Sequence, residues 1–189
     1  KIVTKQAQKT SLDVLYFADS LGSMDPSKIL DLVKIFRKNW KGTIGIHTHN
    51  NLGNAIANSL AAIKSGVSWI DCTVTGMGRG PGNAQTEYLI IELQDIKKRE
   101  IKILPLLKLI KKHFYSMQQK YKWGSNPYYY LAGKHGIHPT YIQEMLMINF
   151  EENEIMAAID QLRLSGGKKY NVDLVRSEFQ KPVKLKNGR

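Results

Sequence analysis

The stretch that decides the fold is residues 43–66, TIGIHTHNNLGNAIANSLAAIKSG. Its first part, residues 43–49, has the composition of a short buried strand. The part that follows predicts a helix that ends at Gly66 and whose apolar face is formed by Leu52, Ala55, Ile56, Ser59 and Ile63. A strand that leads directly into an amphipathic helix is the repeating unit of a parallel α/β sheet or barrel.

The same unit is expected on both sides of this stretch. Upstream, residues 14–18 form a strand that ends at Asp19 and Ser20, and Asp25 followed by Pro26 opens a helix as an N-cap and a first-turn proline. Downstream, residues 67–74 form a third strand, which leads into the glycine-rich loop 76–83 and a helix that begins near Ala84. The first region, residues 1–100, is therefore built from strand-helix units.

The second region, residues 101–189, carries no strand pattern and is expected to be helical. An aromatic, turn-rich stretch at 123–130 is too irregular to predict a simple helix. The predicted helices begin at Pro105 and continue near 140–148, 153–164 and 172–179.

The composition fits an ordinary soluble globular protein. The chain has 189 residues, 42% of them hydrophobic, and no apolar run long enough for a membrane span or a signal peptide. Its single cysteine, Cys72, excludes an internal disulfide, and we expect it to be a small buried residue in a cytoplasmic protein. The net charge of +12 is spread over helices and tail, so we expect a solvated basic surface with neither a membrane nor a nucleic-acid partner.

Polar side chains gather where the predicted strands end. His47 and His49 are two residues apart on a strand, so both point to one face and can bind a single metal ion. The alternative is that the two imidazoles hydrogen-bond each other and the loop backbone. Asp71 shares a face with Thr73 and is expected to point inward, near the site or against a ligand histidine.

Three segments together carry a family resemblance. They are Asp19-Ser20-x-Gly22-x-Met24, the run from Gly45 through His47, His49, Asn50, Gly53 and Ala55 to Ser59, and the run from Ile70 through Asp71, Thr73, Gly76, Gly78, Gly80 and Gly82 to Asn83-Ala84. The combination resembles the barrel metallolyases, the family of HMG-CoA lyase, isopropylmalate synthase and 4-hydroxy-2-oxovalerate aldolase. The resemblance covers residues 14 to about 95 and is closest to the aldolase branch.

The resemblance implies the C-terminal part of a TIM (β/α)8 barrel, about three strand-helix units, followed by a helical region. It implies that His47 and His49 are ligands of Mn²⁺ or Mg²⁺, that Asn83 completes or supports that site, and that Ser20 lies near a bound keto acid. Asp19 and Asp71 are then expected to orient the metal ligands without binding the metal ion themselves.

The activity implied by the resemblance is cleavage of a 4-hydroxy-2-oxo acid by a divalent-metal-dependent carbon-carbon lyase. A tyrosine of the second region would assist, and Tyr128, Tyr129 and Tyr130 are the candidates, with aromatic packing as the alternative for all three. Arg79, in the glycine-rich loop, would hold the anionic substrate, unless it is a solvent-facing arginine.

One part of the family pattern has no match here. The family takes its third metal ligand, an aspartate, and a neighbouring arginine from the first barrel strand, and a whole barrel needs roughly 250 residues. We therefore expect this chain to associate with the missing barrel segment or with a copy of itself. Two other functions stay open: a Claisen-type acyltransferase of the isopropylmalate synthase kind, and a non-catalytic basic interaction module.

Overall fold

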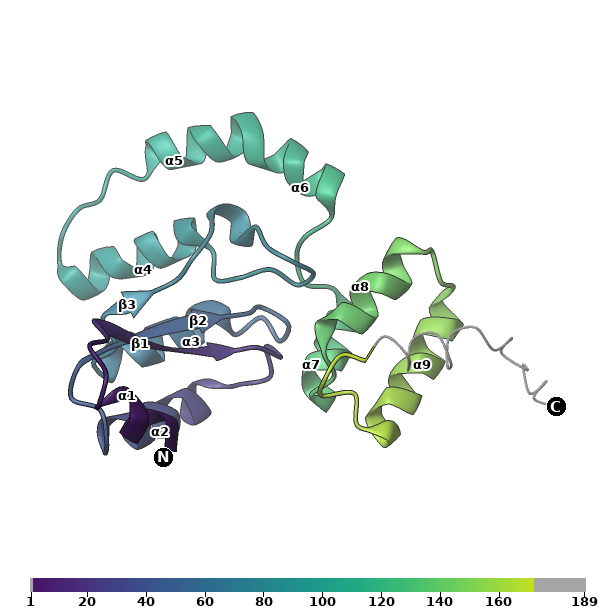
Figure 1. The fold of residues 1–189 in the computed structure, drawn as a ribbon. Helices are drawn as coiled ribbons and strands as arrows, with labels where there is room; N and C mark the ends of the chain where they lie inside the picture. The colour runs from purple at the N-terminus through teal and green to yellow at the C-terminus, as the bar shows by residue number, and fades with distance from the viewer. Residues whose placement is uncertain (1, 172–189) are drawn as a thin grey trace.

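The computed structural model describes residues 2–171 and contains a three-stranded parallel sheet within that range. The strands are β1 (Val14–Asp19), β2 (Thr43–Thr48) and β3 (Trp69–Ile70), in the order β1-β2-β3. The helices α2 (Pro26–Arg37) and α3 (Ala55–Lys64) connect them. The predicted α/β class with three strand-helix units is therefore confirmed, and Figure 1 shows both connecting helices beside the sheet.

One face of the sheet packs against these helices. Along β1 the burial alternates, with Leu15 and Phe17 buried and Tyr16 exposed. The buried cluster on the helix side also includes Ile29, Val33, Ile44, Ile46, Ala62 and Val67. The opposite face carries Tyr16, Gly45 and Trp69 in one cross-strand row, and Ala18 and His47 in the next. On this opposite face the side chains of Tyr16 and Trp69 are exposed.

The start of α2 follows the sequence prediction. The Asp25 side chain accepts a hydrogen bond from the backbone N–H of Lys28 at 3.0 Å, and Pro26 occupies the first helical position. The end of α3 likewise comes before Gly66, whose φ of +89° is a conformation that suits glycine.

The third strand is much shorter than predicted. Only Trp69 and Ile70 pair with β2, because the chain leaves the ladder after the N–H of Asp71 donates to the carbonyl of Ile46. Thr73 then pairs with the returning loop near Gln85, and a 3₁₀ turn, η1 (Val74–Gly76), follows. Cys72, predicted to be buried, is only half-buried in this irregular segment.

The loop also delays the next helix. The N–H of Ala84 donates to the carbonyl of Thr48 at 3.3 Å, so this residue is held beside the strand. The helix α4 (Thr86–Lys97) consequently begins two residues after the predicted position.

The second region is helical, as predicted. A long helical segment consists of α5 (Leu104–Leu109), a π-helical turn η2 (Ile110–Phe114) and α6 (Tyr115–Tyr121), and Figure 1 shows it running above α4. It is followed by α7 (Pro127–His135), α8 (Pro139–Met147) and α9 (Glu152–Ser165). The predicted helices near 140–148 and 153–164 are thus present, and the one predicted at 172–179 lies outside the described residues.

The structure corrects the prediction in two further places. Residues 127–130 belong to α7 and are not irregular, because the Asn126 side chain caps the helix by accepting from the N–H of Tyr129 at 3.0 Å, and Pro127 fits the first position. The short helix α1 (Ile2–Ala7) was not anticipated.

A second buried cluster lies among α7, α8 and α9. It contains Ile137, Tyr141, Ile142, Met145, Ile155, Ile159 and Leu162. The predicted boundary at residue 100 remains a prediction. None of the helices within residues 2–171 combines the length and the apolar character that crossing a membrane would require.

Candidate metal and active site

His47 and His49 lie together at the carboxyl end of β2. Their ring centroids are 4.8 Å apart and the ring planes are nearly perpendicular, at 80°. His47 is the last but one residue of the strand, and His49 follows it and forms an isolated bridge with Asn83. In parallel α/β proteins this end of the strands is where ligands bind.

The Nδ1 atom of each imidazole already has a partner. Nδ1 of His49 lies 2.8 Å from the backbone carbonyl oxygen of Asp19, and Nδ1 of His47 lies 3.2 Å from Oδ2 of Asp71. A carbonyl oxygen can only accept, so Nδ1 of His49 donates and its Nε2 keeps a lone pair. A carboxylate acts in the same way on His47. Both rings are therefore held in the tautomer whose Nε2 can bind a metal ion.

Asp19 supports His49 through its main chain. Its buried side chain instead accepts the backbone N–H groups of Ser23 and Met24, each at 3.1 Å, and so fixes the turn after β1. Burial raises the pKa of this carboxyl, while the two N–H donors act in the opposite direction.

Asp71 lies one step further across the sheet from His47. Gly45 pairs with Trp69, so the residue two positions after Trp69 falls beside the residue two positions after Gly45. The Asp71 side chain is 47% exposed, on the same face of the sheet as His47. Whether it supports a bound metal remains a proposal.

The glycine-rich loop folds back onto the end of β2. The N–H of Asn50 donates to the carbonyl of Gly82 at 2.9 Å, and the N–H of Asn83 donates to the carbonyl of Gly76 at 3.1 Å. Gly82 has a φ of +78°, and a Cβ there would lie 2.4 Å from the Gly76 oxygen, so the loop requires glycine. This fold sets Asn83 beside His49, where its Nδ2 donates to the carbonyl of Met77 at 3.2 Å.

Ser20 and Arg79 are both exposed. Ser20 directly follows β1, and Arg79 belongs to the glycine-rich loop. The pKa of His49 is lowered mainly by burial, and the positive charges of His47 and Arg79 also lower it. Arg79 therefore lies close enough to His49 to affect its charge state.

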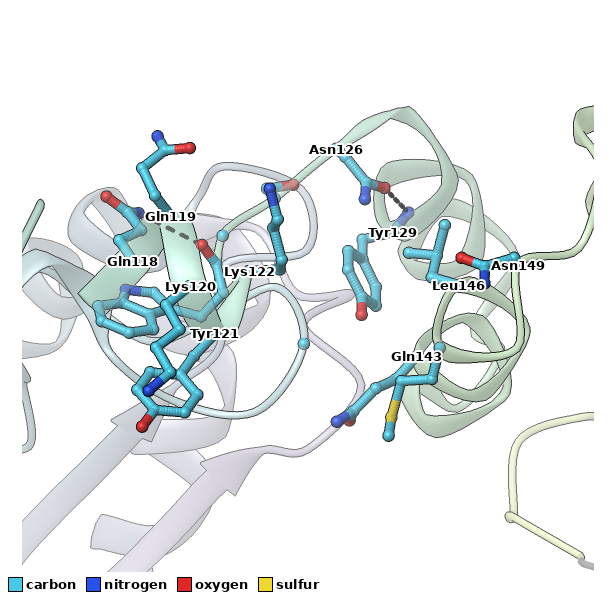
Figure 2. Close-up of a pocket in the computed structure, with 15 residues that line it drawn as sticks. Gln118, Gln119, Lys120, Tyr121, Lys122, Asn126, Tyr129, Gln143, Leu146 and Asn149 are labelled. Atoms are coloured by element: carbon cyan, nitrogen blue, oxygen red, sulfur yellow. Dashed lines mark hydrogen bonds between the residues drawn. The ribbon is translucent and has the colours of Figure 1, made fainter. Parts of the chain in front are cut away.

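The structure distinguishes the three tyrosines at the start of α7. Tyr130 is exposed, and Tyr128 packs against the second buried cluster. Tyr129 is buried, and a Cβ on Gly80 would lie 3.1 Å from its ring, so its phenol adjoins the glycine-rich loop (Figure 2). Burial raises the pKa of Tyr129 to about 12, although the charge of Arg79 acts to lower it.

Sequence reasoning missed the residues that join the two regions. The Trp123 indole N–H donates to the carbonyl of Thr75 at 3.1 Å, and the Ser125 hydroxyl donates to the carbonyl of Asn51 at 2.9 Å. Asn51 is fully buried, and a Cβ added to Gly133 of α7 would lie 3.0 Å from the Cβ of Asn51. These contacts link positions 48 to 82 residues apart in the chain, so no local pattern could reveal them.

The donor set can contribute to a divalent-cation site but offers only part of a ligand shell. Two imidazole nitrogens and the Oδ1 of Asn83 are at hand, and within residues 2–171 no group of three His, Cys, Asp or Glu side chains could hold a metal ion.

Comparison with known proteins places these features in a family. The HMGL-like family matches residues 1–111. A 4-hydroxy-2-oxovalerate aldolase from Geobacillus genomosp. 3 is 45% identical over 89 residues, which are 47% of this chain and 26% of that protein. A 2-isopropylmalate synthase 2 from Caldanaerobacter subterraneus subsp. tengcongensis is 36% identical over 97 residues, which are 51% of this chain and 25% of that protein.

A solved structure shows the same fold over more of the chain. The N-terminal domain of an aldolase-like protein from Bacteroides vulgatus has a TM-score of 0.67 and 34% sequence identity, and the match covers 77% of this chain and 48% of that one. The chain spans about a quarter of the length of the curated relatives it matches. Because the family match covers more than half of its residues, the chain belongs to the HMGL-like family.

Proposed function

We propose that this chain carries the metal-binding end of the active site of an aldolase that cleaves a 4-hydroxy-2-oxo acid into pyruvate and an aldehyde. The observation that supports this most directly is the His47–His49 pair, whose rings are 4.8 Å apart and whose Nδ1 atoms both have partners among residues 2–171, which leaves the Nε2 atoms, with their lone pairs, as the metal-binding atoms. The aldolase names of several relatives support the choice of reaction.

The residues present can take part in binding a divalent cation, for which we propose Mn²⁺ or Mg²⁺. His47 and His49 would supply nitrogen ligands, and Asn83, whose Nδ2 is engaged with Met77, would supply its Oδ1. When bound, the ion supplies Lewis-acid polarisation of the keto group of the substrate.

The side chains around the pair have distinct tasks in the proposed reaction. Asp71 and the Asp19 carbonyl hold the imidazoles in orientation. Arg79 and Ser20 are both exposed at this end of the sheet. Arg79 would bind the carboxylate of the substrate, and Ser20 would bind a polar group of it.

We propose that the phenol of Tyr129 lies near the 4-hydroxyl of the substrate and donates a hydrogen bond to it. During cleavage a base removes the proton of the 4-hydroxyl, the C4–O double bond of the aldehyde forms as the C3–C4 bond breaks, the electron pair of that bond gives the enolate of pyruvate, and a proton delivered to C3 completes pyruvate. Burial raises the pKa of Tyr129 to about 12, so its phenol is protonated at neutral pH and can donate a hydrogen bond. We assign the base to none of the described residues.

A Claisen-type acyl transfer is the second candidate, because 2-isopropylmalate synthases also match. The two reactions share the polarised keto acid and differ in the second substrate, which is an acyl thioester in the Claisen case. Pyruvate release from 4-hydroxy-2-oxopentanoate and thiol release from acetyl-CoA with a 2-oxo acid therefore distinguish them.

The test begins with metal binding, which does not depend on turnover. Mn²⁺ is titrated into the chain, and free Mn²⁺ is followed by electron paramagnetic resonance for the parent and for His47→Ala, His49→Ala and the control His135→Ala, an exposed residue at the end of α7. We expect both site variants to lose binding and the control to keep it. Equal binding in all four proteins would refute the ligand assignment, and thiol release without pyruvate release would favour the Claisen reaction.

A further inference from the structure

A second cavity lies apart from the histidine pair. It has a volume of about 1000 Å³, is open to solvent on one side, and is lined by residues of α6, the connecting segment 122–126, α7 and α8 (Figure 2). Neither His47 nor His49 is among the residues that line it. Of the residues assigned to the proposed aldolase reaction, only Tyr129 is among the described residues that line the cavity, so that reaction does not account for the lysine and amide side chains found there.

The charged side chains on the cavity wall are all basic. Lys120 and Lys122 line it, and among the described lining residues there is no aspartate or glutamate. Within residues 2–171 neither ammonium forms an ion pair with a carboxylate, and Nζ of Lys120 lies 5.2 Å from the centroid of the Tyr121 ring. Two cations without a counter-charge at one concave surface favour an anionic ligand.

One wall of the cavity also holds an unused acceptor. Oε1 of Gln143, on α8, is buried and has no hydrogen-bond partner within the described residues. Leaving a buried acceptor unpaired costs stability, so such atoms call for an explanation. A ligand that carries a hydroxyl or amide donor would satisfy this oxygen.

The remaining lining groups indicate the chemical character of the rest of the ligand, beyond its anionic group. Amide side chains at Gln119, Asn126 and Asn149 offer donors and acceptors, and Leu146 adds an apolar surface. A phosphate monoester carries a charge of about −1.5 to −2 at pH 7, which matches two lysine ammonium groups. We propose that this cavity is a binding site for a small phosphate monoester with a polar, hydroxyl-bearing body.

The site is tied to the candidate active site by backbone contacts. The N–H of Gly124 donates to the carbonyl of Gly80 at 2.9 Å, and Gly80 follows Arg79 in the glycine-rich loop. The ring of Tyr129 lines the cavity and packs on the same glycine. The proposed phosphate site shares Tyr129 with the proposed aldolase site, but it can be tested separately, because phosphate binding can be measured without turnover.

The test is calorimetric titration of the chain with ribose 5-phosphate, AMP, adenosine and inorganic phosphate. The site variant is Lys120→Gln with Lys122→Gln, and the matched control is Lys111→Gln with Lys112→Gln, which removes the same charge from exposed lysines of η2 in the same helical segment. We expect saturable binding of a phosphate ester that weakens about tenfold or more in the site variant and is unchanged in the control. We expect no binding of adenosine.

Gln143→Met separates ligand binding from folding. It removes the unpaired amide with little change of volume, so we expect the melting temperature to stay the same or rise while ester affinity falls. The proposal is overturned if no ester binds, if both lysine variants weaken binding equally, or if inorganic phosphate binds as tightly as the esters. A loss of Mn²⁺ binding by the histidine variants would leave these results unaffected.

Discussion

At the scale of single residues, Asp71 is the side chain whose role is easiest to test. Its carboxylate lies 3.2 Å from Nδ1 of His47 and fixes that ring. Partners of metal-ligating histidines typically contribute about 10–100-fold to metal affinity. We expect Asp71→Asn to weaken Mn²⁺ binding by about tenfold without lowering the melting temperature, because the side chain is half-exposed.

The control for this prediction is Asp31→Asn. Asp31 is an exposed residue of α2 whose carboxylate pairs with Lys34. Its replacement by Asn removes the same charge at a position away from the histidines. Equal Mn²⁺ affinity in the parent, Asp71→Asn and Asp31→Asn proteins would show that Asp71 has no part in the site.

Asp25 gives a second test at the residue scale, through pH. Its hydrogen bonds with Ser27 and the N–H of Lys28 lower the pKa of the carboxyl to about 2. A carboxyl with a lowered pKa in the folded state adds stability above its unfolded pKa of about 3.9, and this stability is lost as the pH falls through the folded value. Its contribution should therefore disappear between about pH 4 and about pH 2.

Thermal unfolding across this pH range measures the effect. Asp25→Asn keeps an oxygen that can cap α2 but cannot ionise, so its melting temperature should lie below the parent's at pH 7 and converge with it near pH 2. Asp25→Ala, which lacks the cap oxygen, should be less stable than Asp25→Asn throughout. A constant gap between the parent and Asp25→Asn would contradict the assignment.

At the scale of elements, the glycine-rich loop depends on one backbone approach. Gly82→Ala would place a Cβ 2.4 Å from the carbonyl oxygen of Gly76 and force a residue with a side chain into positive φ. The positive φ alone costs about 1–2 kcal/mol, and relieving the collision adds to it. We expect the free energy of unfolding in urea to fall by more than about 2 kcal/mol, or Mn²⁺ affinity to fall as Asn83 is displaced.

Gly53→Ala is the matched control for the loop. Gly53 also has a positive φ, +72°, but a Cβ there would meet no atom within 4 Å. It should therefore show the cost of φ alone and leave Mn²⁺ binding unchanged. If the two variants lose the same stability and bind Mn²⁺ equally, the close approach at Gly82 is unimportant.

The elements also show how far sequence reasoning reaches. The strands β1 and β2 and the start of α2 follow directly from local patterns, because apolar runs and an Asp-Pro cap act over a few residues. The end of the third strand could not be predicted, since the backbone of Thr73 pairs with Ala84 and Thr86, which are 11 and 13 residues away in the chain.

Among the site residues, the pairing of His47 with His49 follows from strand periodicity. The choice among Tyr128, Tyr129 and Tyr130 does not, because it depends on the phase that the Asn126 cap gives to α7. The cavity lined by Lys120, Lys122 and Gln143 could not be predicted either, since its lining residues come from segments that are separated in the chain.

At the scale of the whole molecule, the open face of the sheet is the feature with the largest consequence. Tyr16 and Trp69, 39% and 56% exposed, flank Gly45 on the face that carries His47. Within the described residues no strand pairs with the outer edge of β1. Exposed aromatic surface next to a free strand edge favours association.

We therefore expect the purified chain to self-associate in a concentration-dependent way, because another copy is the partner available in that solution. Sedimentation velocity over a range of concentrations measures this. Tyr16→Thr with Trp69→Thr should shift the distribution toward monomer, since it removes the apolar row while keeping residues that suit strands. The control Tyr88→Thr changes an exposed tyrosine of α4, 54% exposed, and should leave the distribution unchanged. A chain that stays monomeric at every concentration, or that responds equally to both changes, would show that this face does not drive assembly.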